Sequence, residues 1–234
     1  MRYKAIMFDL DGTLLPLNQK EFVKEYFKLL AKDTSSYLSF ESLYSSTFLG
    51  VEAMVKNDGK LLNKEVFWKV FEKASGISSM VFEPICDNFY RNGFKKAKDL
   101  THENPLAKKA LDIAHQKADK VILATNPVFP LIAQETRLDF IGLKASDFDY
   151  ITSYENVGFA KPNPKYYLDI CEKINCNHEE CLMIGNDGYE DMYASSVVGF
   201  DTYLVLGYEI LSKDHPYSGK KGDFKEMVEM LEGI

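Results

Sequence analysis

Short apolar runs that recur along the chain constrain its fold more than any other feature. Each run has four to six residues and precedes a polar loop and an amphipathic stretch. Apolar runs in which polar residues do not alternate are typical of strands buried on both faces. The clearest runs cover residues 5–8, 121–124, 181–184 and 203–206, and residues 149–153 form a weaker fifth.

Segments with the apolar spacing of helices separate these predicted strands. Strands that alternate with helices along a chain indicate a doubly wound parallel sheet, which is an α/β fold. The predicted helices cover residues 105–117, 128–139, 164–175, 188–197 and 223–233.

The stretch from about residue 17 to residue 100 has a different pattern. It contains no convincing strand, and its apolar residues follow helical spacing almost throughout. Gly76 and Gly93 are predicted to end helices within it. We therefore expect an all-α insert between the first and second strands, with its aromatic residues packed as a core and a few of them facing the active site. The aromatic residues concerned include Phe22, Tyr26, Phe48, Trp68 and Tyr90.

The composition excludes several classes of protein. A net charge of -7 argues against a nucleic-acid binder, because phosphate contacts require clustered Lys and Arg. The apolar run before Asp9 is too short for a signal peptide, and no uncharged stretch approaches the ~18 residues that a membrane span needs. We therefore expect a cytoplasmic protein that binds neither nucleic acid nor membrane, and its oligomeric state stays open.

The four cysteines are Cys86, Cys171, Cys176 and Cys181. They form no CxxC pair, and the sequence has no His-x-x-x-His that would complete a zinc site. We expect reduced, partly buried thiols, as is usual inside cells.

The first predicted strand leads into two carboxylates, Asp9 and Asp11, which are followed by Gly12. Side chains two residues apart can face the same side as a strand ends, and a glycine allows backbone amides to approach an anion. Two adjacent carboxylates repel each other unless one holds a proton or both share a cation. That arrangement suits a site in which one carboxylate is a nucleophile and the other a proton donor.

Two further motifs carry groups that can bind phosphate. Thr125 and Asn126 follow the second strand and offer a hydroxyl and an amide beside a helix terminus. Lys161 lies between strands in Ala-Lys-Pro-Asn-Pro, where two prolines restrict the backbone around it. A fixed ammonium group can offset the negative charge of aspartates and phosphate. Each of these motifs alone is also compatible with an ordinary helix start or turn.

The fourth motif follows the strand at 181–184 and reads Gly185-Asn186-Asp187-Gly188-Tyr189-Glu190-Asp191. Hard oxygen ligands clustered after a strand suit Mg²⁺, which prefers octahedral oxygen coordination. An acidic turn that caps a helix would have the same composition.

Together, Asp-x-Asp-Gly-Thr, Thr-Asn, Lys-Pro and Gly-x-Asp-x-x-x-Asp, in this order and at strand ends, resemble the four motifs of the haloacid dehalogenase superfamily. The resemblance extends over about residues 3 to 207. It implies a Rossmann-like catalytic core at residues 1–16 and 101–234. The insert at 17–100 would be the cap domain of the helical-cap subclass.

The resemblance also implies a role for each residue. Asp9 would attack phosphorus and become an aspartyl phosphate, and Asp11 would protonate the leaving alcohol and then activate water. Thr125, Asn126 and Lys161 would bind the phosphoryl oxygens, with backbone amides near Asp11 and Gly12 assisting.

The same resemblance implies a Mg²⁺ site, at which this chain departs from the family pattern. The Asp9 carboxylate, the Asp11 carbonyl and an oxygen from the fourth motif would hold the ion. The position after Gly185, usually aspartate, is Asn186, so either its neutral amide oxygen or the neighbouring Asp187 is the ligand. We favour Asn186, with Asp187 close by and Asp191 orienting metal waters or Lys161.

These features predict a Mg²⁺-dependent phosphatase that hydrolyses a small phosphorylated metabolite, such as a sugar phosphate or nucleotide. An acid two residues after the nucleophile indicates phosphoryl transfer and not dehalogenation. A phosphomutase of the same fold remains an alternative, as does a non-catalytic member that binds a phosphorylated ligand, which Asn186 favours. The sequence does not specify the substrate.

Overall fold

The computed structural model describes residues 3–234, and their strands form a six-stranded sheet in the order β3-β2-β1-β4-β5-β6. Every pair of neighbouring strands is parallel. The prediction of a parallel α/β sheet is therefore confirmed. The strands are β1 (Tyr3–Phe8), β2 (Ala118–Leu123), β3 (Tyr150–Ile151), β4 (Cys181–Gly185), β5 (Asp201–Val205) and β6 (Lys220–Gly222).

The five predicted strands correspond to β1 to β5, whereas β6 was not predicted. Lys220 and Lys221 in β6 are exposed, and the strand pairs only with β5 at the edge of the sheet. An exposed edge strand buries too few apolar side chains to leave an alternating or continuous apolar pattern in the sequence.

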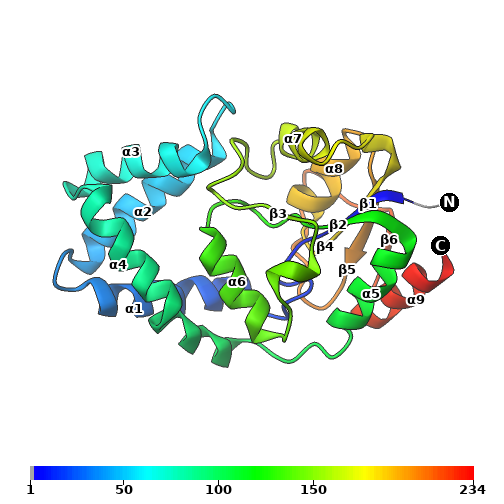
Figure 1. The fold of residues 1–234 in the computed structure, drawn as a ribbon, viewed down its shortest axis with the longest axis horizontal. Helices are drawn as coiled ribbons and strands as arrows, with labels where there is room; N and C mark the ends of the chain where they lie inside the picture. Colours follow the sequence, from blue (N-terminus) through cyan, green and yellow to red (C-terminus); the bar gives the residue numbers. More distant parts are fainter. Residues whose placement is uncertain (1–2) are drawn as a thin grey trace.

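Helices cover both faces of the sheet (Figure 1). Ile6 and Phe8 of β1 pack in one apolar cluster with α5 and α9, while Ala5 and Met7 pack in a second cluster with α7. Successive side chains of a strand point to opposite faces, so this division confirms a doubly wound sheet. The helices from residue 107 onward are α5 (Ala107–Lys117), α6 (Leu131–Phe140), α7 (Lys165–Ile174), α8 (Ala194–Ser196) and α9 (Phe224–Gly233), with a π-helix at Gly188–Tyr193 and short 3₁₀ turns at Ala145–Asp147 and His178–Glu180.

The segment between β1 and α5 is helical, as predicted, and lies at the end of the molecule away from both termini (Figure 1). We call this segment the cap. Asn18, Ser39 and Ser78 begin three of its helices by accepting hydrogen bonds from backbone N–H groups in the first turn. No helix in the described part of the chain is long and apolar enough to span a membrane. The elements of the cap are α1 (Gln19–Thr34), α2 (Phe40–Val55), α3 (Asn63–Ser75), α4 (Ser79–Arg91) and a 3₁₀ helix at Gly93–Leu100.

Of the two glycines predicted to end helices, only Gly76 does so. It follows α3 in the left-handed region with φ of 76°, which glycine adopts at little cost. Gly93 instead begins the 3₁₀ helix, since α4 ends at Arg91. A Cβ atom on Gly93 would lie 2.2 Å from the Asp33 carboxylate, so the residue allows close packing of α1 against the 3₁₀ helix.

Most of the cap aromatics named above are buried, as predicted, and one is not. Phe22, Tyr26, Trp68 and Tyr90 are all at most 7% exposed. Phe48 on α2 is 59% exposed, so its assignment to the packed core was wrong. Helical spacing places Phe48 on the same side as Tyr44, whose ring stacks on it at a centroid distance of 6.1 Å.

Candidate active site

The predicted functional motifs meet at the carboxyl ends of β1, β2 and β4. These strands are neighbours, and the chain passes from one side of β1 to the other between β3 and β4. Ligands of open α/β sheets bind at such a reversal of strand order. A cavity of about 100 Å³, here called the phosphate cavity, lies there. Its lining includes Asp9, Asp11, Thr125, Asn126, Asn186, Asp187 and Asp191.

The backbone holds Asp9 rigidly at the end of β1. Its N–H donates to the carbonyl of Ile184 at 2.9 Å, and the carbonyl of Phe8 accepts from Ala124 N–H at 2.8 Å. The side chain of Asp9 is nearly buried, because the residue is only 7% exposed. A carboxylate fixed in this way keeps its oxygens in one place relative to the sheet edge.

Gly12 shapes the loop after β1, but its N–H group is already used. Its φ of 84° lies in the left-handed region, and a Cβ atom there would meet Asn186 Nδ2 at 2.3 Å. Its N–H donates to the carbonyl of Leu15 at 2.8 Å. The N–H groups of Asp11 and Asn126, by contrast, form no hydrogen bond with any residue from 3 to 234. Those two amides are therefore free to donate to an anion.

Thr125 is held by two residues that sequence reasoning missed. Its carbonyl accepts from the hydroxyl of Thr152 at 2.7 Å and from that of Tyr166 at 2.9 Å. Both hydroxyls are buried, and they are also 3.0 Å from each other. This network fixes the backbone of Thr125, so that its own hydroxyl faces the phosphate cavity.

Lys161 joins two carboxylates that line the phosphate cavity, those of Asp9 and Asp191. Its Nζ atom lies 2.9 Å from Asp9 Oδ1 and 2.6 Å from Asp191 Oδ1, and the residue is 1% exposed. Burial alone would lower the pKa of this ammonium, but Asp191 and Asp9 outweigh it and raise the pKa well above its ordinary value. Lys161 is therefore a permanent cation beside Asp9. Asp191 also accepts from Asp187 N–H at 3.0 Å.

Asn186 and Asp187 both line the phosphate cavity, and each has a second structural contact. Asn186 Nδ2 donates to the carbonyl of Tyr208 at 2.7 Å, and its Oδ1 atom accepts from the Thr13 hydroxyl at 3.3 Å. Asp187 Oδ1 accepts from the N–H groups of Tyr189 and Glu190, both at 2.8 Å, and so caps the π-helix. An aspartate at position 186 could not donate to Tyr208, which explains the amide there.

The oxygen atoms of this site suit Mg²⁺. Besides the side chains of Asn186 and Asp187, the Asp11 carbonyl and Asp9 Oδ2 accept no hydrogen bond from the described residues. No cysteine or histidine lines the phosphate cavity within the part of the chain described. A set of carboxylate, carbonyl and amide oxygens is the kind that Mg²⁺ prefers over softer ligands.

The carboxylate of Asp11 forms an ion pair with Arg137 of α6, a residue that sequence reasoning missed. Arg137 is fully buried, and its Nε donates to the carbonyl of Ala133 at 3.2 Å. Its guanidinium carbon also lies 4.6 Å from the centre of the Phe129 ring. In the sequence, Arg137 looks like an ordinary basic residue in the last turn of a helix.

Only one oxygen of Asp11 is used by this ion pair. Asp11 Oδ1 is buried without any hydrogen-bond partner among the described residues. Burial raises the pKa of Asp11, and the charge of Arg137 opposes this rise. A carboxyl group with a raised pKa and a free oxygen can carry a proton to a bound ligand.

Glu190 is a third acidic group that sequence reasoning quoted but did not assign. Its Oε2 atom accepts from Asn126 Nδ2 at 3.0 Å, and its side chain lines the phosphate cavity. Burial raises the pKa of Glu190 to about 7. The side chain of Asn126 is thus committed to Glu190, and only its backbone N–H is left for an anion.

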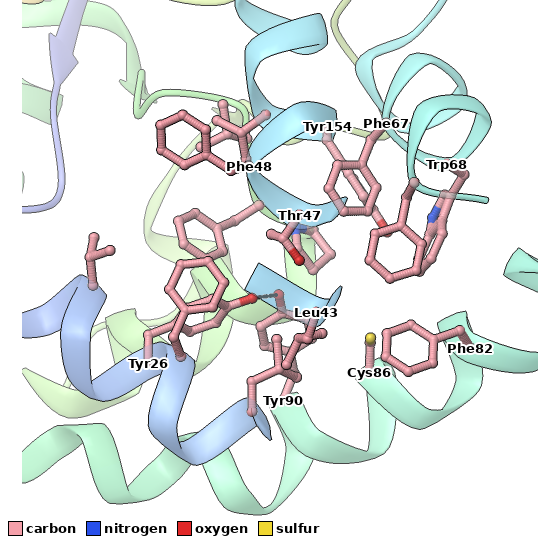
Figure 2. A pocket seen from close by; sticks show the side chains of 18 of the residues that line it. Tyr26, Leu43, Thr47, Phe48, Phe67, Trp68, Phe82, Cys86, Tyr90 and Tyr154 are labelled. Carbon is pink, nitrogen blue, oxygen red and sulfur yellow. Dashed lines mark hydrogen bonds between the residues drawn. The ribbon is translucent and has the colours of Figure 1, made fainter. Parts of the chain in front are cut away.

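A second, larger cavity lies in the cap and is lined mainly by aromatic and aliphatic side chains (Figure 2). This cap cavity has a volume of about 270 Å³. Tyr26 and Tyr90 face each other in it, with their hydroxyls 2.8 Å apart (Figure 2).

The sulfur atoms of three cysteines meet near the amino-terminal end of β4, at the opposite end of the strands from the phosphate cavity. The sulfur of Cys181, at the start of β4, lies 3.9 Å from that of Cys171 and 3.5 Å from that of Cys176. All four cysteines are free thiols, in agreement with the prediction.

Comparisons with known proteins agree with the architecture. A family model described as haloacid dehalogenase-like hydrolase matches residues 3–199. The chain is 22% identical over 219 residues to the pyrophosphatase PpaX of Bacillus velezensis, which covers 92% of this chain and 90% of that protein. It is 24% identical over 220 residues to the phosphoglycolate phosphatase of Nitrosospira multiformis, with 88% of this chain and 84% of that protein covered.

Among solved structures, the fold is similar to that of the HAD hydrolase YfnB from Bacillus subtilis bound to magnesium. The TM-score is 0.59 at 19% sequence identity, and the match covers 99% of this chain and 100% of that one. The likeness therefore includes the cap as well as the sheet.

Proposed function

The chain belongs to the haloacid dehalogenase-like hydrolase family, and from this membership we propose that it is a Mg²⁺-dependent phosphatase of a small phosphorylated metabolite. One observation carries the proposal. Asp9 and Asp11 line the same cavity, and each is paired with its own buried cation, Lys161 or Arg137. This pairing allows a nucleophilic carboxylate and a proton donor to lie side by side at a site that also receives an anion.

In the first step, Asp9 attacks the phosphorus atom of the ester in line with the leaving oxygen. The phosphorus–oxygen bond to the alcohol breaks as an aspartyl phosphate forms, and Asp11 donates its proton to the departing oxygen. Lys161, the Thr125 hydroxyl and the N–H groups of Asp11 and Asn126 bind the phosphoryl oxygens. These groups are fixed before the substrate arrives, so they stabilise the charge of the transition state without rearranging.

In the second step, water attacks the phosphorus of the aspartyl phosphate. Asp11, which lost its proton in the first step, takes one from this water, and the bond from phosphorus to Asp9 breaks. Inorganic phosphate leaves, and Asp9 is regenerated. Asp191 acts through Lys161, because it holds the ammonium against Asp9.

The residues that would hold Mg²⁺ are Asp9 through its carboxylate, Asp11 through its carbonyl and Asn186 through its amide oxygen, with Asp187 close by. A bound Mg²⁺ would supply positive charge that draws the phosphoryl group to Asp9 and neutralises its oxygens. We assign Asn186 as the direct ligand because it directly follows β4, is nearly buried and lines the phosphate cavity with Asp9 and Asp11, whereas Asp187 is more exposed and caps the π-helix.

A screen of phosphorylated metabolites with and without Mg²⁺ tests the proposal, with Asp9→Asn as the inactive control. The expected result is release of inorganic phosphate by the wild-type protein in Mg²⁺ and none by Asp9→Asn. Chromatography of the products with a phosphosugar would identify a phosphomutase, which would form an isomer in place of inorganic phosphate. A wild-type protein that binds phosphate esters but releases no phosphate between pH 5 and 8 would refute the proposal.

A further inference from the structure

We propose that the cap cavity binds the leaving group of the substrate, and that this group is uncharged and largely apolar. The substrate would then be the phosphate monoester of an aryl or alkyl alcohol, and not a sugar phosphate or a compound with a second anionic group. This inference rests on the proposed phosphatase function, which it makes more specific.

The cap cavity adjoins the phosphate cavity. Three residues, Gln19, Val128 and Phe129, line both of them. Gln19 begins α1, directly after the loop that follows Asp9, and the other two follow Asn126. In the proposed complex, a ligand held by its phosphate near Asp9 would reach past Phe129 into the cap.

Phe129 lies between the cap cavity and the proton donor. One neighbour of its ring is Tyr26 of the cap, at a centroid distance of 5.4 Å, and another is Arg137, the partner of Asp11. The boundary of the two cavities is thus the place where the bond between phosphate and leaving group would lie. The oxygen that receives the proton of Asp11 would be at this boundary.

The charges around the cap cavity exclude an anionic leaving group. None of the described residues that line it is Lys, Arg or His, and its one charged lining residue is Asp87, which is acidic. Cys86 beside it is no thiolate, because burial raises its pKa to about 12. A second phosphate or a carboxylate would have to leave water with no cation to receive it, and that is strongly unfavourable.

The cap cavity also has too few polar groups for a sugar. The hydroxyls of Tyr26 and Tyr90 bond to each other, and the other neutral polar groups of the lining are the side chains of Gln19, Thr47 and Tyr154 and the indole N–H of Trp68. The remaining wall consists of rings and branched aliphatic chains, with Leu43, Phe67, Trp68 and Phe82 visible around the space in Figure 2. A sugar would lose hydrogen bonds to water that this wall does not replace, whereas an apolar group gains from burial.

A homologous series of n-alkyl phosphates, from methyl to hexyl, tests the inference with the full-length protein in Mg²⁺. We expect kcat/KM to rise roughly threefold with each added methylene until the cavity is filled, because each buried methylene favours binding by a similar factor. Glucose 6-phosphate should be hydrolysed at least about 100-fold less efficiently than hexyl phosphate. Rates that do not depend on chain length, or that favour the sugar phosphate, would overturn the inference.

A filled cavity gives a second test. Thr47→Phe places a ring in the cap cavity, whereas Ser45→Phe puts the same ring on the exposed side of α2. We expect Thr47→Phe to lower kcat/KM for hexyl phosphate at least about tenfold more than it lowers kcat/KM for methyl phosphate. Val51→Phe, which fills the cavity from one turn further along α2, replaces Thr47→Phe if that variant does not fold.

The two proposals fail in different ways. Hydrolysis of methyl phosphate without any chain-length dependence would contradict the apolar leaving group and leave the phosphatase function intact. If no ester is hydrolysed, calorimetry of Asp9→Asn with methyl and hexyl phosphate still decides the question of the cavity. Binding of hexyl phosphate at least tenfold tighter than methyl phosphate would support the inference, and equal affinities would refute it.

Discussion

Arg137 and Asp11 form an ion pair in which the arginine is fully buried and the aspartate lines the phosphate cavity. The two residues come from different structural elements, one from helix α6 and the other from the loop after β1. The pair gives the proposed proton donor a fixed position and leaves its second oxygen free. Arg137 is therefore a positioning residue that acts through Asp11.

Replacing Arg137 with methionine should change the pH dependence of turnover as well as its rate. Burial raises the pKa of Asp11 and Arg137 lowers it, so the pKa rises further when the guanidinium is removed. The first step needs a protonated Asp11, and hence the alkaline limb of kcat/KM should move to higher pH. The second step needs a base, so kcat at pH 7 should fall at least about tenfold.

Steady-state kinetics from pH 5 to 9 would measure both effects. Arg137→Lys keeps the charge and should retain the wild-type position of the alkaline limb, while Arg91→Met removes an exposed arginine and should change neither quantity. An Arg137→Met enzyme with an unmoved alkaline limb would show that this residue does not act on Asp11.

The sequence was most informative where chemistry and topology coincide. Each predicted motif follows a short apolar run, and parallel strands bring their carboxyl ends to one edge. Asp9, Thr125 and Asn186 therefore had to lie near one another once the strand order placed β1 between β2 and β4. The prolines around Lys161 predicted a fixed backbone there but not the position of its side chain. Its contacts with Asp9 and Asp191 are known only from the structure.

The residues that sequence reasoning missed leave no local signal. Arg137 occupies a position where a basic residue commonly ends a helix, and Thr152 lies in the weakest predicted strand, just after the observed β3. Gly12 was expected to offer its N–H to phosphate, yet the turn uses that group for Leu15. The cap cavity depends on how four helices pack, and helical spacing alone gives the same pattern whether aromatic rings fill a space or surround it.

Changing Asn186 to aspartate should strengthen metal binding and weaken the metal-free fold. A charged ligand attracts Mg²⁺ more strongly than a neutral amide, so the Mg²⁺ concentration for half-maximal activity should fall several-fold. Without metal, the new carboxylate faces the Tyr208 carbonyl in place of a donating amide. The free energy of unfolding in EDTA should therefore fall by about 1–3 kcal/mol.

Mg²⁺ titration of turnover and urea denaturation would measure the two effects of this substitution. Asn177→Asp adds the same charge at an exposed position and is the matched control. If Asp187→Ala changes the Mg²⁺ requirement while Asn186→Asp and Asn186→Ala do not, Asp187 is the direct ligand.

Replacing Lys161 with methionine should abolish activity and destabilise the protein in a pH-dependent way. The substitution leaves Asp9 and Asp191 close together and buried without their cation. Loss of one partner from a buried ion pair typically costs about 3–5 kcal/mol at neutral pH. Protonation of the two unpaired carboxylates relieves their repulsion. The difference in the free energy of unfolding between the variant and the wild type should therefore become smaller as the pH falls from 7 to 5.

Urea denaturation in EDTA at several pH values checks this expectation. Lys165→Met, which removes an exposed lysine four residues away, should leave both activity and stability near their wild-type values. A deficit in Lys161→Met that stays constant with pH would mean that packing, and not the stranded charge, causes the loss.

Glu190 should make the metal-free protein less stable as the pH rises. Its pKa is about 7 in the folded protein against an ordinary value of 4.5, so between these values the folded state binds a proton that the unfolded state does not. The contribution of Glu190 to stability is therefore greatest below about pH 4.5, and it decreases as the pH rises through 7. The total loss is about 3 kcal/mol, since each unit of difference in pKa corresponds to ~1.4 kcal/mol.

Glu190→Gln removes the titrating group and keeps an oxygen that can accept from Asn126. In EDTA, the free energy of unfolding of this variant should decrease between pH 5 and pH 7.5 by about 2–3 kcal/mol less than that of the wild type. Glu179→Gln, at an exposed position in the turn at His178–Glu180, should follow the wild type. If the free energy of unfolding depended on pH equally in Glu190→Gln and in the wild type, Glu190 would not hold a proton in the folded protein at neutral pH. Only a carboxyl group that burial keeps protonated can produce the difference.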